Sequence, residues 1–212
     1  MENKPSLLSI IDDTILNIET QMKSYPGRFL NSDPNQGLSE FSFQLLLYTN
    51  LINQRLQGYT ITLEKILEGY SRCDLFIRND ETNEVFIIEL KYIRISYLKA
   101  SRQQFTNDGK KYQKVLEDVY SKIKDDSKEK LLTLLKWSEY IVSTKDNNTS
   151  VKEFKYEPIQ KVLNKAEIQA MNYAKQYQNM LDWRTKQPKI YYLVIIGIGF
   201  RIIRGVMNLY KK

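Results

Sequence analysis

The pattern of apolar and polar positions predicts two helices in the first part of the chain. Apolar residues recur at helical spacing over residues 6–24, so this segment is predicted to form an amphipathic helix. Residues 25–37 are rich in Pro, Gly, Asn and Ser and predict a loop. A second helix is expected to begin after Ser39, whose hydroxyl can cap it, and to end before Gly58. Glu40 would be favourably placed in its first turn.

The next three segments have the alternation and the β-branched or aromatic content that are typical of strands. They are predicted at 59–66, 73–79 and 84–92. The stretch Asn-Asp-Glu-Thr-Asn at 79–83 concentrates turn-forming residues between the second and third segments. We therefore expect these two strands to pair as an antiparallel hairpin.

A different pattern covers residues 95–157, where amphipathic and highly charged stretches predict a helical insertion. The polar stretch at 143–150 predicts a loop within it. A long helix is then expected over 158–183, followed by two strands at 189–200 and 201–210.

This order of elements predicts an α/β protein with a mixed central sheet flanked by helices. At 212 residues the chain is long enough to bury a core and has the size of one domain. We expect a single domain over 1–212, with an N-terminal helical segment in residues 1–30 and the insertion 95–157 after the third strand.

The third strand carries two charges in an otherwise hydrophobic run. Strand side chains alternate between faces, so Glu89 and Lys91 share one face with Val85 and Ile87, and the other face is wholly apolar. A strand that is apolar on both faces is typical of the centre of a sheet, where an unpaired charge is costly. Another group must therefore balance these two charges.

Composition narrows the chemistry that can provide this balance. The sequence contains no His, which excludes His-based catalytic triads and His-ligated zinc. The single Cys73 cannot form an internal disulfide or a cysteine zinc cluster, and we interpret it as a small buried hydrophobe. Hard oxygen ligands are then the expected metal donors.

The net charge and the hydropathy of the chain indicate which partners and which cellular location to expect. The net charge of +7 favours a polyanionic partner. Scarcity of cysteine fits a reducing compartment, and the longest apolar run is too short to cross a bilayer as a helix. We expect no signal peptide at the start of the chain. We therefore expect a cytoplasmic protein with no membrane partner.

Pairing of the second and third strands would gather three charged residues at one edge of the sheet. Antiparallel neighbours lie about 5 Å apart, so Asp74 would come close to Glu89 and Lys91. A divalent cation would balance the two carboxylates, and Lys91 would position and help to deprotonate a water molecule that attacks a phosphodiester. A structural ion pair at the rim of the sheet is the alternative interpretation.

The spacing of these residues resembles a known signature. Asp74, fourteen intervening residues and then Glu89-Leu90-Lys91 in a hydrophobic strand resemble the D-x(n)-E-x-K pattern of the PD-(D/E)XK nuclease superfamily. The likeness is greatest to the small nuclease domains attached to bacterial AAA-type ATPases and to endosymbiont toxins. It implies a restriction-endonuclease-like αβββαβ core and Mg²⁺ or Mn²⁺ bound by Asp74, Glu89 and the backbone carbonyl of Leu90.

Two further glutamates enter through the same resemblance. Glu40 stands where many members have a glutamate on the first helix, and Glu64 lies on the first strand. Either would reach the metal through water. Their ordinary interpretations are helix electrostatics for Glu40 and a solvent-facing or Lys-paired side chain for Glu64.

The long helix at 158–183 carries another motif. Gln169 and Tyr173 are four residues apart, so they share one helical face. They resemble the Q-x-x-x-Y motif of the exonuclease-like branch, in which the glutamine lines the site and helps to hold water or DNA. An ordinary half-buried helix face is the alternative. The insertion 95–157 departs from the shorter connection that is typical of the superfamily.

Basic residues in the insertion are candidates for nucleic-acid binding. An active site of this kind needs a polyanion nearby, although a solvated helix face explains the same charges. The candidates are Lys99, Arg102, Lys110, Lys111 and Lys114.

The function expected from the residues and the resemblance is that of a Mg²⁺- or Mn²⁺-dependent nuclease, with DNA favoured as substrate. One alternative is a catalytically inactive nuclease-fold module that binds nucleic acid or a protein. Another is an interaction or toxin module covered by a protein partner, for which the insertion 95–157 and the N-terminal helix would be the docking surfaces.

Overall fold

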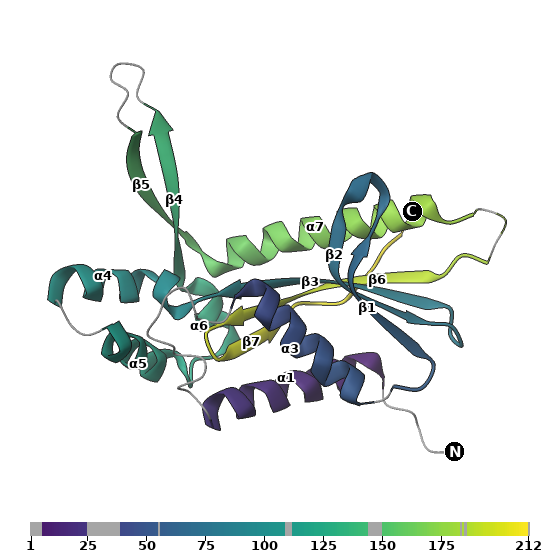
Figure 1. Ribbon diagram of the computed structural model, residues 1–212, viewed down its shortest axis with the longest axis horizontal. Helices are drawn as coiled ribbons and strands as arrows, with labels where there is room; N and C mark the ends of the chain where they lie inside the picture. The colour runs from purple at the N-terminus through teal and green to yellow at the C-terminus, as the bar shows by residue number, and fades with distance from the viewer. Residues whose placement is uncertain are drawn as a thin grey trace.

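The computed structural model describes residues 6–24, 39–54, 56–108, 112–143, 150–182, 184 and 186–211. Within these ranges, side chains are described except for those of residues 105–113 and 139–154. A mixed sheet runs through the centre of the molecule, and helices cover both of its faces (Figure 1). The strands of this sheet are ordered β1-β2-β3-β6-β7, and β8 also pairs with β6. The α/β class with a mixed, helix-flanked sheet is therefore confirmed.

The three strands expected in the first half of the chain are all present. They are β1 (Tyr59–Ile66), β2 (Arg72–Asn79) and β3 (Glu84–Ile93). β2 and β3 form the antiparallel hairpin that the turn-forming residues predicted. Asn79 closes the turn, because its side-chain oxygen accepts hydrogen bonds from the backbone N–H groups of Glu81 and Thr82.

The C-terminal strands complete the sheet. β6 (Lys189–Ile198) lies parallel to β3, which places β3 in the centre. The single strand expected at 201–210 is instead two short strands, β7 (Arg201–Arg204) and β8 (Asn208–Leu209). They are separated where the N–H of Gly205 donates to the carbonyl of Val194.

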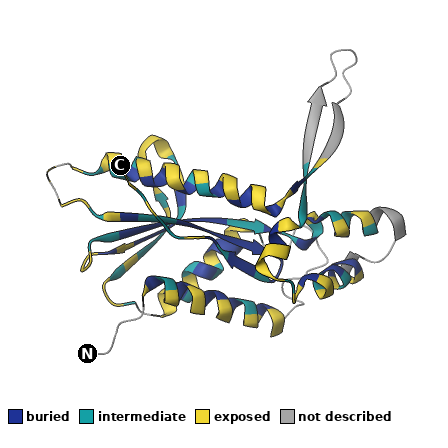
Figure 2. Cartoon of the chain, turned by 180° about the vertical axis from the view of Figure 1, so that it is seen from behind, coloured by how far each residue is buried: buried dark blue, intermediate teal, exposed yellow. Residues whose placement is uncertain are grey.

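The two faces of the sheet are covered by different helices. α1 (Leu7–Ser24) and α3 (Glu40–Asn53) lie on one side, and α7 (Ile159–Met180) lies on the other (Figure 1). All three helices lie where they were predicted. Ser39 caps α3, because its side chain accepts a hydrogen bond from the N–H of Ser42. Figure 2 shows the sheet buried between helices whose outer surfaces are exposed.

Residues 95–157 are not a purely helical insertion. A 3₁₀ turn, η2 (Ile95–Tyr97), leads into three helices, and the second half is an antiparallel hairpin. These elements are α4 (Lys99–Asp108), α5 (Tyr112–Ile123), α6 (Lys128–Thr133), β4 (Leu135–Ser143) and β5 (Ser150–Pro158).

The prediction of helix for the start of this hairpin was wrong because the leucines near residue 131 recur at helical spacing. The residues that follow them, Trp137, Tyr140, Ile141 and Val142, favour strands. Pairing with β5, which satisfies the backbone groups of β4, decides the outcome.

No helix among the described residues is long and apolar enough to cross a membrane.

Candidate active site

The candidate site lies where β2 and β3 separate. Their ladder runs from Asn79 opposite Glu84 to Leu75 opposite Ile88 and then stops. If it continued, Asp74 and Glu89 would be directly opposed on the same face. Instead the carboxylate of Asp74 enters the gap, and its Oδ2 accepts a hydrogen bond from the backbone N–H of Leu90 at 2.7 Å.

The pairing of β1 with β2 is also interrupted at Asp74. Leu63 opposes Leu75 and Lys65 opposes Cys73, but the intervening pair is missing, and Glu64 has a φ of 50°. Such a left-handed conformation is strained for a residue other than glycine. The carbonyl of Asp74 instead accepts from Nε2 of Gln44 on α3, at 2.8 Å.

Glu89 is the buried acid of the site. It lies on the face of β3 that packs against α7, and it is only 1% exposed. Its Oε1 accepts from the ammonium of Lys91 at 2.6 Å. Its Oε2 finds no hydrogen-bond donor among the described residues. The carboxyls of Asp74 and Glu89 lie close enough to share a hydrogen bond when one is protonated.

Burial and mutual repulsion disfavour two ionised carboxyls here. Burial and, after it, the charge of Asp74 raise the pKa of Glu89, Lys91 opposes both effects, and the net result is a pKa of about 8. Burial also raises the pKa of Asp74, against the hydrogen bond from the Leu90 N–H and the charge of Lys91. The pair therefore retains a proton near neutral pH unless a cation takes its place.

Lys91 remains an ammonium in this arrangement. Burial by itself lowers its pKa, but the hydrogen bond and charge of Glu89, together with the charges of Glu40 and Asp74, raise it overall. A protonated Lys91 is suited to holding an anion. It is not suited to accepting a proton while Glu89 remains its partner.

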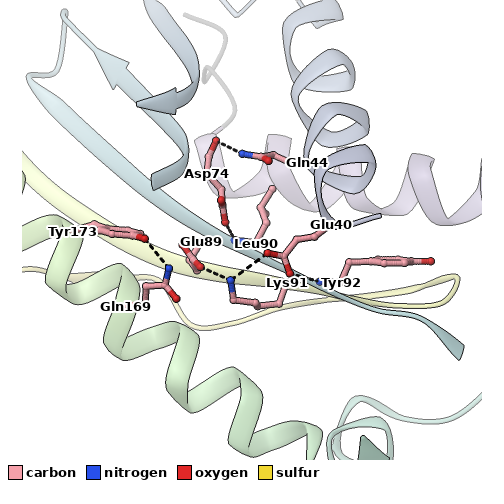
Figure 3. A network of polar contacts seen from close by, with 9 residues as sticks. All are labelled: Glu40, Gln44, Asp74, Glu89, Leu90, Lys91, Tyr92, Gln169 and Tyr173. Carbon is pink, nitrogen blue, oxygen red and sulfur yellow. Dashed lines mark hydrogen bonds and ion pairs between the residues drawn. The ribbon is translucent and has the colours of Figure 1, made fainter. Parts of the chain in front are cut away.

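Residues from both helical layers converge on these groups (Figure 3). Glu40 reaches from the first turn of α3, with Oε1 3.4 Å from Lys91 Nζ and Oε2 3.4 Å from the backbone N of Tyr92. Gln169 and Tyr173 come from α7 on the opposite side, and Gln169 Nε2 donates to the Tyr173 hydroxyl at 2.6 Å. Six of the candidate side chains thus lie together with Leu90: Glu40, Asp74, Glu89, Lys91, Gln169 and Tyr173.

Glu64 is engaged elsewhere. Its Oε2 lies 3.2 Å from Nη1 of Arg72, in an exposed ion pair. The contribution of Glu64 to this region is its backbone conformation beside Asp74, and its carboxylate makes a surface interaction.

The basic residues proposed to bind nucleic acid do not all project freely into solvent, because two of them lie against aromatic rings. Lys99 lies over the ring of Tyr156 and Arg102 over the ring of Trp137. Lys114 is exposed on α5, whereas Lys110 and Lys111 lie outside the described residues.

Sequence reasoning missed two residues of the site. Gln44 is buried and holds the main chain of Asp74. It lies four residues after Glu40, so helical spacing places both on one face of α3, and this signal was available. The ring of Tyr92 packs at a tilt against Phe43, and its hydroxyl donates a hydrogen bond to the carbonyl of Gly199. Nothing in the sequence pattern indicated that contact.

Cys73, next to Asp74, is excluded as a nucleophile. It is fully buried, and burial, aided by the charge of Asp74, raises the pKa of its thiol to about 12. The interpretation of Cys73 as a small buried hydrophobe agrees with this environment.

The residues present fit a hard divalent cation, although the described residues contain no group of three or more His, Cys, Asp or Glu arranged to hold a metal. The donors are Asp74, Glu89 and the carbonyl of Leu90. In a regular strand the N–H and C=O of one residue point the same way, so the Leu90 carbonyl is expected to face the gap where its N–H meets Asp74. The unpartnered Glu89 Oε2 is the further oxygen that such an ion would use.

The comparisons with known proteins identify no relative of this chain. No family model matches the chain, and neither a curated protein nor a solved structure matches it.

Proposed function

We propose that this protein is a divalent-metal-dependent nuclease that hydrolyses phosphodiester bonds, with DNA as the favoured substrate. The observation that carries the proposal is the meeting of Asp74 and Glu89 in the gap between β2 and β3, with the Lys91 ammonium 2.6 Å from Glu89. Two neighbouring carboxyls that repel each other, of which Glu89 is fully buried, are stabilised when a hard cation replaces the proton that the pair retains.

The order of elements supports a restriction-endonuclease-like core. α3, β1, β2, β3, α7 and β6 follow one another as in the αβββαβ arrangement of the PD-(D/E)XK superfamily. β6 returns parallel to β3 after α7, which puts the strand carrying Glu89 and Lys91 in the centre of the sheet. The presence of Asp74 on β2 and of Glu89-Leu90-Lys91 on β3 supports the same assignment.

Each residue has a chemical role in the proposed reaction. Asp74, Glu89 and the Leu90 carbonyl would hold Mg²⁺ or Mn²⁺, and a bound ion supplies charge neutralisation and a water of lowered pKa. Once Glu89 is engaged, the Lys91 ammonium orients the water and stabilises charge that develops on the phosphate. Gln44 holds the Asp74 backbone, and Glu40 restrains Lys91 from the other side. Gln169 and Tyr173 border the site from α7.

A plasmid-nicking assay tests the proposal. Purified protein is expected to nick supercoiled DNA with Mg²⁺ or Mn²⁺ and to lose this activity with EDTA. Glu89→Gln and Lys91→Met should each reduce the rate by about 100-fold or more, since each removes a group that acts on the metal or on the developing charge. Glu157→Gln is the matched control, because Glu157 is a buried carboxyl on β5 that pairs with Lys161 and Lys165.

The outcomes separate the alternatives. Nicking that is equal in wild type and both site variants would refute catalysis at this site. DNA binding by wild type without any metal-dependent nicking would favour the inactive nuclease-fold module.

A further inference from the structure

Three aromatic rings in the insertion each lie beside a cationic side chain. We name this set the aromatic–cation platform: Tyr97 with Arg94 at 5.8 Å, Trp137 with Arg102 at 5.0 Å, and Tyr156 with Lys99 at 5.2 Å. The rings come from η2, β4 and β5 respectively, so distant parts of the chain assemble the platform.

The platform is held together by specific contacts. Tyr97 and Trp137 pack edge to face with centroids 5.6 Å apart. The indole N–H of Trp137 donates to the carbonyl of Ser96 at 3.2 Å, and a bridge between Leu98 and Lys136 ties the segment after η2 to β4. This arrangement presets the rings, so a ligand that stacks on them would not have to order them.

The rings of the platform remain accessible. Tyr97 is 36% exposed, and Trp137 and Tyr156 are partly exposed. Partly exposed aromatic rings combined with several positive charges are the combination that binds unpaired nucleotides, because bases stack on the rings while cations attract phosphates. A duplex would offer its phosphates to the cations, but its bases are already stacked on each other.

The platform also follows the candidate active site along the chain. β3 carries Lys91 and leads directly through Arg94 to Tyr97. Tyr97 lies six positions after Lys91, a span of at most about 22 Å even when the chain is fully extended. A single strand of nucleic acid can therefore contact both regions.

We propose that the aromatic–cation platform binds a single-stranded segment of nucleic acid and guides it to the site at Asp74 and Glu89. This inference rests on the proposed nuclease function and narrows its substrate to nucleic acid with an unpaired region. An exclusively duplex-binding or protein-binding platform is the competing possibility, and the experiment below distinguishes it.

Intrinsic fluorescence gives a direct test. The chain has two tryptophans, Trp137 and Trp183, so Trp183→Phe leaves Trp137 as the only reporter. The additional change Glu89→Gln prevents cleavage. Titration with a twelve-residue oligothymidylate should quench Trp137, whereas a blunt duplex of the same length and a base-free polyphosphate should quench it much less.

Substitutions at Tyr97 test whether its ring is required. Tyr97→Ala should weaken binding of fluorescein-labelled oligothymidylate, followed by anisotropy, by about tenfold or more, because it removes one stacking surface. Tyr97→Phe keeps the ring and should retain the affinity. Tyr70→Ala is the matched control, because Tyr70 is 92% exposed on the turn between β1 and β2, outside the platform.

The proposal is overturned if polyphosphate or duplex quenches Trp137 as strongly as the single strand does. It is also overturned if Tyr97→Ala and Tyr70→Ala bind alike. Metal-dependent nicking by wild type with an inert platform would leave the nuclease function standing and remove only this inference. Quenching by oligothymidylate without nicking would support the platform and remove the catalytic proposal.

Discussion

The protonation of Glu89 should make the stability of the metal-free protein fall as pH rises. In the folded chain the pKa of Glu89 is about 8, against an ordinary value of 4.5, because burial and the charge of Asp74 disfavour the carboxylate. Between these two values the folded state binds a proton that the unfolded state does not. The stabilisation is complete below pH 4.5 and is lost as pH rises through 8.

The size of the effect follows from the difference between the two pKa values. Each unit corresponds to about 1.4 kcal/mol, so the full difference amounts to about 5 kcal/mol. About half of it, roughly 2–3 kcal/mol, is lost between pH 6 and pH 9. The raised pKa of Asp74 works in the same direction. Glu89→Gln cannot ionise, so this part of the pH dependence should be absent from that variant.

Urea unfolding in EDTA at several pH values from 6 to 9, followed by far-ultraviolet circular dichroism, measures how the free energy of unfolding of wild type and of Glu89→Gln depends on pH. The free energy of unfolding of wild type should fall by about 2–3 kcal/mol more than that of Glu89→Gln. Glu157→Gln controls for loss of a buried carboxyl. Burial raises the pKa of Glu157, but hydrogen bonds from Lys165 and Lys161 lower it overall, so this group is ionised throughout the range.

Parallel pH profiles for wild type and Glu89→Gln would refute the reasoning. They would mean that Glu89 is ionised in the folded state over the whole range and that the Asp74–Glu89 pair holds no proton for a metal to replace.

Three further changes test other contacts of the site. Mn²⁺ should raise the melting temperature of wild type but not that of Glu89→Gln. At a hundredfold excess over Kd the gain in stability is about 2.7 kcal/mol, which corresponds to about 5–10 °C in thermal denaturation. Equal shifts in both proteins would place the ion elsewhere. Gln44→Leu leaves the partly buried Asp74 carbonyl without its donor and should cost about 1–3 kcal/mol in urea unfolding; an unchanged midpoint would show that this bond is dispensable. Gly197→Ala places a Cβ 2.6 Å from Cδ2 of Tyr92, and the forced shift of the ring should cost about 1–3 kcal/mol by the same measurement, whereas a neutral effect would show that Tyr92 moves freely.

Much of the candidate site could be predicted because it depends on local periodicity and strand register. The turn at 79–83 sets the register of β2 with β3, and that register puts Asp74 opposite Glu89 by counting residues along the two strands. Helical spacing likewise placed Gln169 beside Tyr173.

Contacts between segments that are distant in the sequence could not be predicted by counting residues along strands and helices. Gln44 approaches the Asp74 carbonyl only because α3 packs under the sheet, and Glu64 turns to Arg72 because β1 is distorted beside Asp74. The hairpin of β4 and β5 was missed for a related reason. Its first strand follows leucines at helical spacing, and pairing with β5, which lies later in the chain, outweighs that local preference.

The sequence by itself determined which residue types are available, where most helices and strands lie, and that two charges interrupt a hydrophobic strand. Only the tertiary structure decided the electrostatic state of those charges. Burial of Glu89 under α7, the carboxylate of Asp74 in the gap between β2 and β3, and the approach of Glu40 to Lys91 all come from packing of separate elements. Because a pKa depends on solvation and on charges in space, ordinary acids became a proton-holding pair only when the chain folded around them.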